Sequence, residues 1–568
     1  MPPSRLELLG SAKARAALLW LLLLAAAVFF LWPALRPVHV EGFSASIVAL
    51  GLHMSQGAVR DFMPFAPFNA DYFGLTKLGA VDGVAALSPF VGGEGAMRVE
   101  MWAGAALCLG ASAWLIRRWT DASWLIIGAV LLFFPGVAES FFFFNDNVPA
   151  AGLMLLALAL WAWRPSLPIA VLAGALIGYA VAIRTDTVLV AATAMPLVAL
   201  ETRGLWRATL MTAVAGVVAI VVLVALFALA HATPIDALRA GVIAVKLWDR
   251  PSDFVRHALI VIYFLGAPAL LLLFIGTVGF VQERHWLRLA LAAGVPLFVN
   301  LVLMGKMWEV RQLLVLSPFL GALAAKGIGF LIASLRDHRP VAPLFVAGIT
   351  IAWLFSPAAG IVASDGPRAL SGRVAGLLLW NEWQQSVRSD FQHIDDAVAL
   401  APPNGVLAVL TDGWNDDRYL HLELVKQGFR RSPSPQPCSA IGEAMTANGR
   451  TVVELSIRQT FLPTFPALDG QRFEHYAMPC LAAIHPARTI LLADSERLDE
   501  IYGKADRERG LDPRLVKATR GRIIAVPLDN AALGVLDQAY RKEAQAFGGQ
   551  FSAENAMAMT QSQTEFSR

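Results

Sequence analysis

The feature that most constrains this chain is a succession of long apolar segments before residue 360. An α-helix needs roughly 20 consecutive apolar residues to cross the hydrocarbon core of a bilayer. The segments that approach this length are 14–35, 97–116, 122–142, 148–163, 168–183, 187–200, 208–230, 258–281, 287–305, 312–333 and 341–359. Hydrophobic residues make up 57% of the chain and charged residues only 16%, which is too apolar for an ordinary soluble protein. We therefore predict a multi-pass α-helical membrane protein with about eleven spanning helices.

The rest of the chain has the composition of a water-soluble protein. Segments typical of strands, "GVLAVLTDG", "TVVELSI", "RTILLADS" and "GRIIAVPL", alternate with helical patterns. We expect a membrane domain over residues 1–360 with a long first loop at 36–96, an α/β domain over 361–547, and a disordered tail over 548–568. The net charge of +3 comes from basic residues at helix ends rather than from a patch, so it does not indicate nucleic-acid binding.

Arginines in alternate loops predict the orientation. If the N-terminus is cytoplasmic, every even-numbered connection contains arginine, as the positive-inside rule requires. These arginines are Arg117, Arg118, Arg164, Arg203, Arg207, Arg284, Arg288, Arg336 and Arg339. The odd-numbered loops and the α/β domain then face outward, into the periplasm of a bacterial inner (plasma) membrane. In that oxidising compartment Cys438 and Cys480 could form a disulfide.

The odd-numbered loops differ from the basic ones because they carry both signs of charge. Their candidate functional residues are Glu41, Asp61, Asp71, Asn145, Asp146, Arg184, Lys246, Arg250, Lys306 and Arg311. The stretch "EGFSASIVALGLHMSQG" in the first loop has helical spacing and is too short to span, which predicts an interfacial helix. No Cys/His spacing indicates zinc, and no phosphate loop is present. The acidic loops would allow a divalent metal, although no ligand spacing demands one and no cofactor is firmly implied.

Four segments resemble those of the GT-C membrane glycosyltransferases, which include the protein O-mannosyltransferases and the lipid A aminoarabinose transferases. "VEGFSASI" looks like their DEGxYxxxA pattern, and "FFFFNDNVPAAGLMLLALALWAW" resembles their acidic residue at the mouth of a helix. "AGALIGYAVAIRTDTVLVAATAMPLVAL" resembles their helical hairpin, and "EVRQLLVLSPFLGALAAKGIG" resembles a later segment. The resemblance covers roughly residues 15–335. It implies transfer of a sugar from a polyprenyl-phosphate donor to the hydroxyl of a lipid or glycan acceptor, with inversion.

The resemblance also implies roles. Glu41 would be the general base, a role worth about 10²–10⁴-fold, and Asp146 a second catalytic carboxylate. Cations would hold the charge of the leaving phosphate. The candidates for that binding are Arg184, Arg311, Lys306, Lys246 and Arg250. Asp61, Asp71 and Asn145 are further site candidates, and no metal ligand is assigned.

Alternatives stay open at this stage. Asn145 or Asp146 could cap the next helix, and Arg184 could simply pair with Asp186. A transporter or flippase for a lipid-linked glycan would place polar residues at mid-bilayer rather than at one face. A catalytically degenerate structural partner is a third reading, because Glu41 alone matches the family's usual acidic pair.

Overall fold

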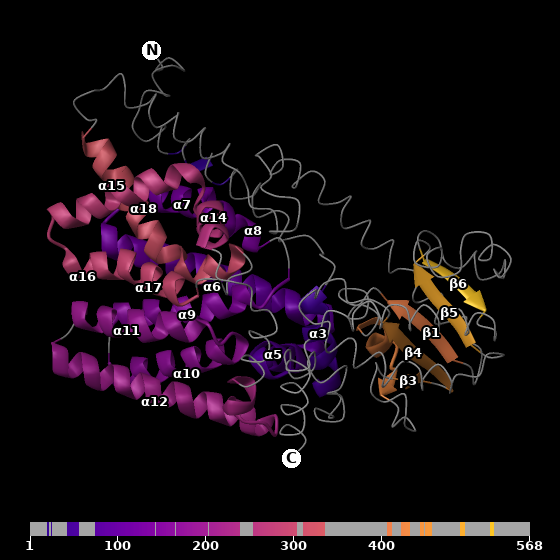
Figure 1. Ribbon diagram of the computed structural model, residues 1–568. Helices are drawn as coiled ribbons and strands as arrows, with labels where there is room; N and C mark the ends of the chain where they lie inside the picture. The colour runs from indigo at the N-terminus through magenta and orange to yellow at the C-terminus, as the bar shows by residue number, and fades with distance from the viewer. Residues whose placement is uncertain are drawn as a thin grey trace, which may run out of the picture.

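The computed structural model of the chain describes residues 42–55, 74–141, 144–164, 166–202, 204–238, 254–303 and 310–334, a few residues between 17 and 24, and short segments between 406 and 527. The helices are α3 (Gly42–Ser55), α5 (Leu78–Val91), α6 (Gly93–Thr120), α7 (Trp124–Phe133), α8 (Pro135–Ser140), α9 (Asn147–Trp163), α10 (Leu167–Ile183), α11 (Thr187–Thr202), α12 (Leu205–Leu229), α14 (Phe254–Leu265), α15 (Ala267–Gln282), α16 (Trp286–Leu289), the π-helix η1 (Ala290–Gly294), α17 (Val295–Val302), the 3-10 helix η2 (Val310–Leu316) and α18 (Ser317–Ser334) (Figure 1).

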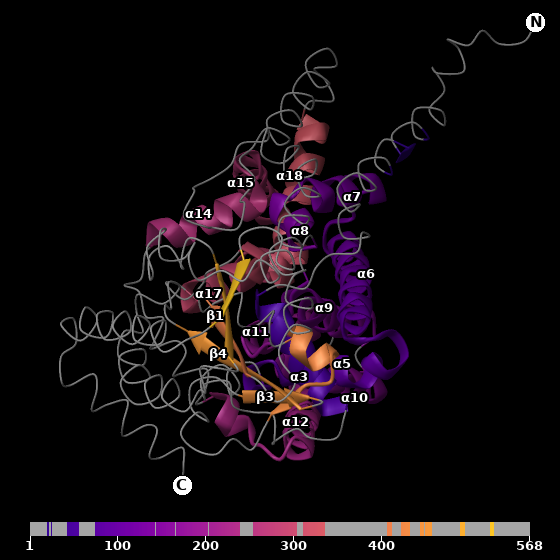
Figure 2. The same cartoon turned by 90° about the vertical axis from the view of Figure 1, so that its right-hand side faces the viewer.

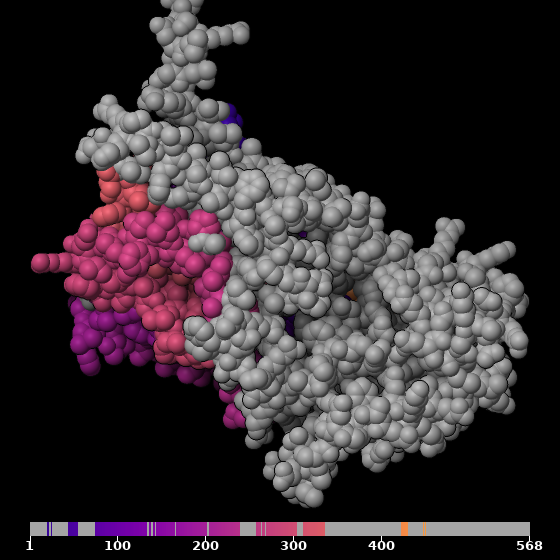
Figure 3. Space-filling model, turned by 45° about the horizontal axis from the view of Figure 1, so that its top comes forward, coloured from indigo at the N-terminus to yellow at the C-terminus, as the bar shows by residue number. Residues whose placement is uncertain are grey.

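The helices form one bundle around a continuous apolar core. Helix α6 packs against α9 and α18, α9 against α10, α10 against α12, and α15 against α18. Three helices of the described part are long and apolar enough to cross a membrane: Gly93–Thr120, Leu205–Leu229 and Arg311–Ser334. Helix α12 leaves Val217, Ile220 and Val221 exposed. The outer faces of the magenta and pink helices form one continuous surface (Figure 3). The exposed apolar side chains of α12 suit a helix that faces lipid.

Glycines let pairs of these helices approach closely. A Cβ on Gly174 of α10 would lie 2.4 Å from the carbonyl oxygen of Ala215 on α12, and one on Gly178 would lie 2.5 Å from that of Ala219. The two glycines are four residues apart and therefore share one face of α10. This small-residue spacing is typical of membrane helix pairs, where backbone contact replaces the hydrophobic effect.

Several predicted helices are interrupted, so the predicted count of eleven spans is not confirmed. The predicted segment 122–142 is broken at Phe134, before Pro135, which cannot donate a helical hydrogen bond. The segment 258–281 is broken at Gly266, whose φ of 77° lies in the left-handed region. The segment 287–305 contains the π-helix η1.

The first loop contains more helix than we predicted. Helix α3 forms where the interfacial helix was expected. Its apolar residues Ala45, Ile47 and Val48 are buried, and so are its polar residues Ser44 and Ser46. It packs against α5 and α6 instead of exposing a polar face. The prediction of a helix there is confirmed, and its position along the membrane interface stays a prediction. Helix α5 was not predicted.

The described C-terminal segments form a six-stranded sheet. Its strands are β1 (Val406–Thr411), β2 (Arg430–Arg431), β3 (Ala444–Ala447), β4 (Arg450–Ser456), β5 (Thr489–Asp494) and β6 (Ile523–Pro527), in the order β2-β3-β4-β1-β5-β6. Strand β1 pairs in parallel with β4 and β5, and the remaining pairs are antiparallel. All four predicted strands are present. The α/β domain as a unit, its boundaries, the tail, and Cys438 and Cys480 stay predictions, because most of that region lies outside the described residues.

The C-terminal region contacts the bundle through residues 422–429. Leu422, Val425 and Phe429 are buried in the same apolar cluster as the bundle helices. Lys426 donates a hydrogen bond to Glu94 in the first turn of α6. The sheet therefore lies beside α3 and α5, at one end of the bundle (Figures 1 and 2).

Candidate functional site

The start of α9 divides its polar tasks between two neighbouring residues. Asn145 Oδ1 accepts hydrogen bonds from the backbone N–H groups of Asn147 (3.1 Å) and Val148 (3.3 Å). Its Nδ2 donates to the carbonyl of Ser140 at 3.0 Å. Asn145 thus satisfies N–H groups that a helix start leaves unpaired. Asp146 makes no capping hydrogen bond, so its carboxylate is left for other contacts.

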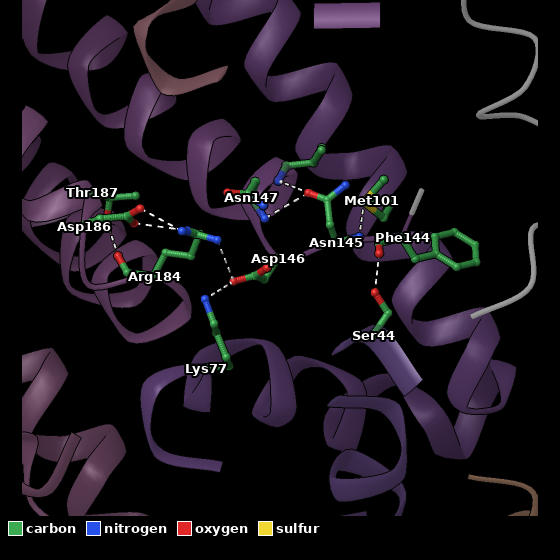
Figure 4. Close-up of polar contacts among 11 residues, drawn as sticks. Ser44, Lys77, Met101, Phe144, Asn145, Asp146, Asn147, Arg184, Asp186 and Thr187 are labelled. Carbon is green, nitrogen blue, oxygen red and sulfur yellow. Dashed lines mark hydrogen bonds and ion pairs between the residues drawn. The ribbon is translucent and has the colours of Figure 1, made fainter. Parts of the chain in front are cut away.

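Asp146 is the centre of a buried ionic cluster. Its Oδ2 lies 2.5 Å from Lys77 Nζ and 3.3 Å from Arg184 Nη1. Arg184 in turn donates two hydrogen bonds to Asp186, from Nη2 to Oδ2 at 2.8 Å and from Nε to Oδ1 at 3.1 Å (Figure 4). The side chains of Lys77, Asp146 and Arg184 are only 10–12% exposed. We call these four residues the Asp146 cluster.

Helix ends bring the Asp146 cluster together. Lys77 immediately precedes α5, and Arg184 immediately follows α10. The Thr187 hydroxyl donates to the Arg184 carbonyl at 2.7 Å, which fixes the turn into α11. Helix α5 lies close to α10 because Gly79 has no side chain: a Cβ there would lie 2.8 Å from Ile183 Cγ1. The four polar side chains of the Asp146 cluster thus lie at helix ends, where the apolar segments stop.

Burial and charge act in opposite directions on Asp146. Burial alone would raise the pKa of its carboxyl group, but the cations Lys77 and Arg184 outweigh burial and lower that pKa to about 2. Arg311, in η2, lies near enough to lower it further. Burial lowers the pKa of Lys77. Among the residues that the structure describes, the three cations Lys77, Arg184 and Arg311 therefore lie near the carboxylates of Asp146 and Asp186.

A second buried polar group involves residues of α5 and α6. Both carboxylate oxygens of Glu100, on α6, are buried and have no hydrogen-bond partner among the residues that the structure describes. Asp82 on α5 is near enough to repel the Glu100 carboxylate. Gly83 leaves the space for Glu100, because a Cβ there would lie 1.9 Å from Glu100 Oε1. Tyr179 donates to the Gly79 carbonyl at 2.9 Å and borders the same space.

The predicted candidates fall into two sets. Asn145, Asp146, Arg184 and Arg311 are described and lie at one end of the bundle. The others lie outside the described residues: Glu41, Asp61, Asp71, Lys246, Arg250 and Lys306. Within the described part, no group of three or more His, Cys, Asp and Glu side chains could hold a metal ion.

The helix that follows Glu41 in the sequence contacts the segment just before Asp146. Helix α3 begins at Gly42, directly after Glu41. The hydroxyl of Ser44, in the first turn of α3, donates to the carbonyl of Phe144, two residues before Asp146 (Figure 4).

Lys77 was not among the predicted site residues. It lies in "GLTKLGAVDG", within a loop whose charged residues we took from other positions. A lone lysine directly before an apolar run was the available signal. The anticipated pairing of Arg184 with Asp186 is present, but it coexists with the contact to Asp146.

The opposite end of the bundle carries the predicted inner-loop arginines. Arg288 Nε lies 3.1 Å from Glu201 Oε1, at the end of α11. Arg288 Nη1 also donates to the carbonyl of Trp119, at the end of α6. The side of the membrane on which these arginines lie stays a prediction.

Solved structures resemble this chain over most of its length. The structure of ArnT from Cupriavidus metallidurans bound to undecaprenyl phosphate matches 91% of this chain and 98% of its own, with a TM-score of 0.51 and 16% sequence identity. The apo state of the same protein matches 90% and 98%, with a TM-score of 0.52 and 17% identity. This chain has a GT-C fold. At such identities the likeness establishes the fold alone.

The other comparisons add little to the GT-C assignment. The oligosaccharyltransferase AglB from Archaeoglobus fulgidus, in complex with an inhibitory peptide and a dolichol-phosphate, matches 84% of this chain and 69% of its own, with a TM-score of 0.46 and 11% identity. No known protein family and no curated protein matches the sequence. The GT-C resemblance predicted from the sequence is thus confirmed for the fold.

Proposed function

We propose that this chain is a membrane glycosyltransferase that moves a sugar from a polyprenyl-phosphate donor to an acceptor hydroxyl at the outer face of a bacterial inner membrane. The observation that carries the proposal is the Asp146 cluster, a buried and cation-rich site at helix ends. The GT-C fold supports it, and ArnT, which shares that fold, has been solved with undecaprenyl phosphate.

The donor phosphate would bind to Lys77, Arg184 and Arg311. Arg184 already forms a bidentate contact with the Asp186 carboxylate, and phosphate oxygens suit the same planar fork. Lys77 provides a compact charge that needs no fixed orientation. In transfer, the bond between the anomeric carbon and the phosphate oxygen breaks and its electrons stay on the phosphate. Fixed cations stabilise that charge in a site that excludes water.

Asp146 suits the role of a positioning residue better than that of a base. A carboxylate with a pKa of about 2 is a weak proton acceptor at neutral pH. It would hold Lys77 and Arg184 in place until the donor arrives. Glu41 remains our candidate for the base, because its neighbour Ser44 contacts the Asp146 segment. Glu41 would take the proton of the acceptor hydroxyl as its oxygen attacks the anomeric carbon from the face opposite the phosphate, which inverts that centre.

The two other readings make different predictions. A transporter or flippase would place charges near mid-bilayer, whereas the Asp146 cluster lies where helices end. A degenerate structural partner would tolerate loss of Glu41 and of Lys77.

Binding of undecaprenyl phosphate to the purified full chain in nanodiscs is the first test. We expect Lys77→Ala and Arg184→Ala each to weaken binding at least tenfold, because each removes a cation from the phosphate site. Arg207→Ala is the matched control, since Arg207 is exposed at the start of α12. Equal affinities for all three variants would contradict the assigned phosphate site.

Glycan and lipid mass spectrometry of a deletion strain tests the activity itself. Complementation with the wild-type gene should restore the missing glycan, and complementation with Glu41→Gln should not. Full restoration by Glu41→Gln would show that Glu41 is not the base. A strain that lacks no glycan and accumulates no lipid-linked sugar would argue for the structural-partner reading.

A further inference from the structure

A buried histidine outside the Asp146 cluster has one ring nitrogen that receives no hydrogen bond from the residues that the structure describes. His257, in the first turn of α14, is only 6% exposed. Its Nε2 lies 2.9 Å from Asn300 Oδ1 on α17. Asn300 Nδ2 donates to the carbonyl of Pro296 at 2.8 Å, which fixes the orientation of the amide because a carbonyl can only accept. Asn300 therefore presents an acceptor to His257, and Nε2 must carry the hydrogen.

The other nitrogen, Nδ1, is left with a lone pair. In the neutral ring, a hydrogen on Nε2 makes Nδ1 an acceptor. Nδ1 is buried, and none of the residues that the structure describes gives it a hydrogen bond. Buried polar atoms are rarely left unpaired, since such an atom has lost its water without a replacement. A molecule that donates a hydrogen bond would satisfy it.

The position of the pair points to which molecule this is. Helix α14 follows directly on the segment that contains Lys246 and Arg250, and α17 is followed by the segment that contains Lys306. Helix α14 packs against η2, which carries Arg311, and η2 packs against α9, which starts at the Asp146 cluster. The His257–Asn300 pair thus joins α17 to a helix that packs against η2, the element that carries Arg311.

We propose that Nδ1 of His257 accepts a hydrogen bond from a hydroxyl group of the sugar carried by the polyprenyl-phosphate donor. The inference rests on the proposed function. A phosphate diester ionised at neutral pH has no hydrogen to give to this lone pair, whereas a sugar hydroxyl has one. Asn300 acts as a positioning residue, because its acceptor sets both the tautomer and the ring plane. His257 is a specificity-determining residue: a donor lipid without that hydroxyl leaves Nδ1 unpaired.

Two substitutions separate binding from a merely structural role. In His257→Gln, the side-chain amide nitrogen reaches the place of Nε2 and keeps the donation to Asn300, while nothing replaces Nδ1. In His257→Asn, the shorter amide reaches the place of Nδ1 and can accept from a hydroxyl, while the contact with Asn300 is lost. The full-length protein in nanodiscs is titrated with undecaprenyl phosphate and with undecaprenyl-phosphate-linked glucose, mannose, galactose and arabinose, and its melting temperature is recorded.

We expect the wild type to bind at least one sugar-bearing lipid about tenfold to 100-fold more tightly than undecaprenyl phosphate. His257→Gln should lose most of that preference while its melting temperature and its affinity for undecaprenyl phosphate stay unchanged. His257→Asn should keep part of the preference and melt lower.

Three results would overturn the inference while leaving the proposed function in place, provided that undecaprenyl phosphate binds in a Lys77-dependent manner. The first is that the wild type prefers no sugar-bearing lipid over undecaprenyl phosphate. The second is that His257→Gln keeps this preference unchanged. The third is that only His257→Asn loses the preference and that this variant also melts at a lower temperature. The last would identify the pair as a structural contact. Failure of undecaprenyl phosphate to bind at all would instead overturn the proposed function.

Discussion

The contact between Lys77 and Asp146 allows a quantitative prediction. At neutral pH, the lowering of the Asp146 pKa from its usual 3.8 to about 2 corresponds to about 2 kcal/mol of stabilisation. That stabilisation is present above pH 4, and it is lost only as the pH falls through about 2. Asp146→Asn should cost more, about 3–5 kcal/mol, because it also leaves the buried Lys77 cation without its nearest anion.

A double-mutant cycle isolates this pair. Lys77→Met combined with Asp146→Asn removes both charges, so the double variant should lose at least about 2 kcal/mol less than the sum of the two single variants. The unfolding free energy is measured by denaturant titration in detergent micelles at pH 7. Lys326 and Glu283 form a matched control pair. Lys326 Nζ also lies 2.5 Å from Glu283 Oε1, but the Glu283 side chain is 46% exposed. That pair should show a coupling of about 0–1 kcal/mol. Equal couplings for the two pairs would refute the reasoning.

Three further predictions concern stability, each read as a melting temperature in detergent. At pH 10, where Glu100 is ionised, Glu100→Gln should raise the melting temperature, because none of the described residues gives the buried carboxylate a hydrogen bond and a neutral amide costs less to bury. A lower melting temperature would show that Glu100 has a partner. Gly174→Leu should lower it strongly by forcing α10 from the Ala215 carbonyl, whereas Gly216→Ala, where a Cβ meets nothing within 4 Å, should be nearly neutral. Asn145→Ala should cost about 1 kcal/mol through the lost cap, and no change would contradict the capping role.

The sequence predicted most reliably where one physical signal dominates. Apolar segments located the helices, and alternating apolar patterns located strands such as β1 and β5. The polar residues between two apolar segments correctly indicated a turn at Asp146 and another at Arg184. Breaks such as Phe134 were not predicted, because proline and glycine are tolerated inside membrane helices and therefore do not reliably mark a helix end.

The candidate site was only partly predictable for a different reason. Lys77 joins Asp146 through the packing of α5 against α10, which depends on the missing side chain at Gly79. Such a contact has no periodicity that one sequence could reveal. The capping alternatives for Asn145 and Asp146 were both reasonable from residue type, and tertiary contacts with Lys77 decided between them.

The contact between Lys426 and Glu94 has a consequence for the order in which the protein is made. The two residues are 332 positions apart in the chain. At elongation rates of about 5–20 residues per second, Glu94 is synthesised roughly 15 to 65 seconds before Lys426. Throughout that interval the first turn of α6 lacks its contact with the C-terminal region, because Lys426 has not yet been synthesised. The early helices must therefore hold together in the membrane through their own glycine-mediated contacts, and closure by the C-terminal region is among the last events of biogenesis.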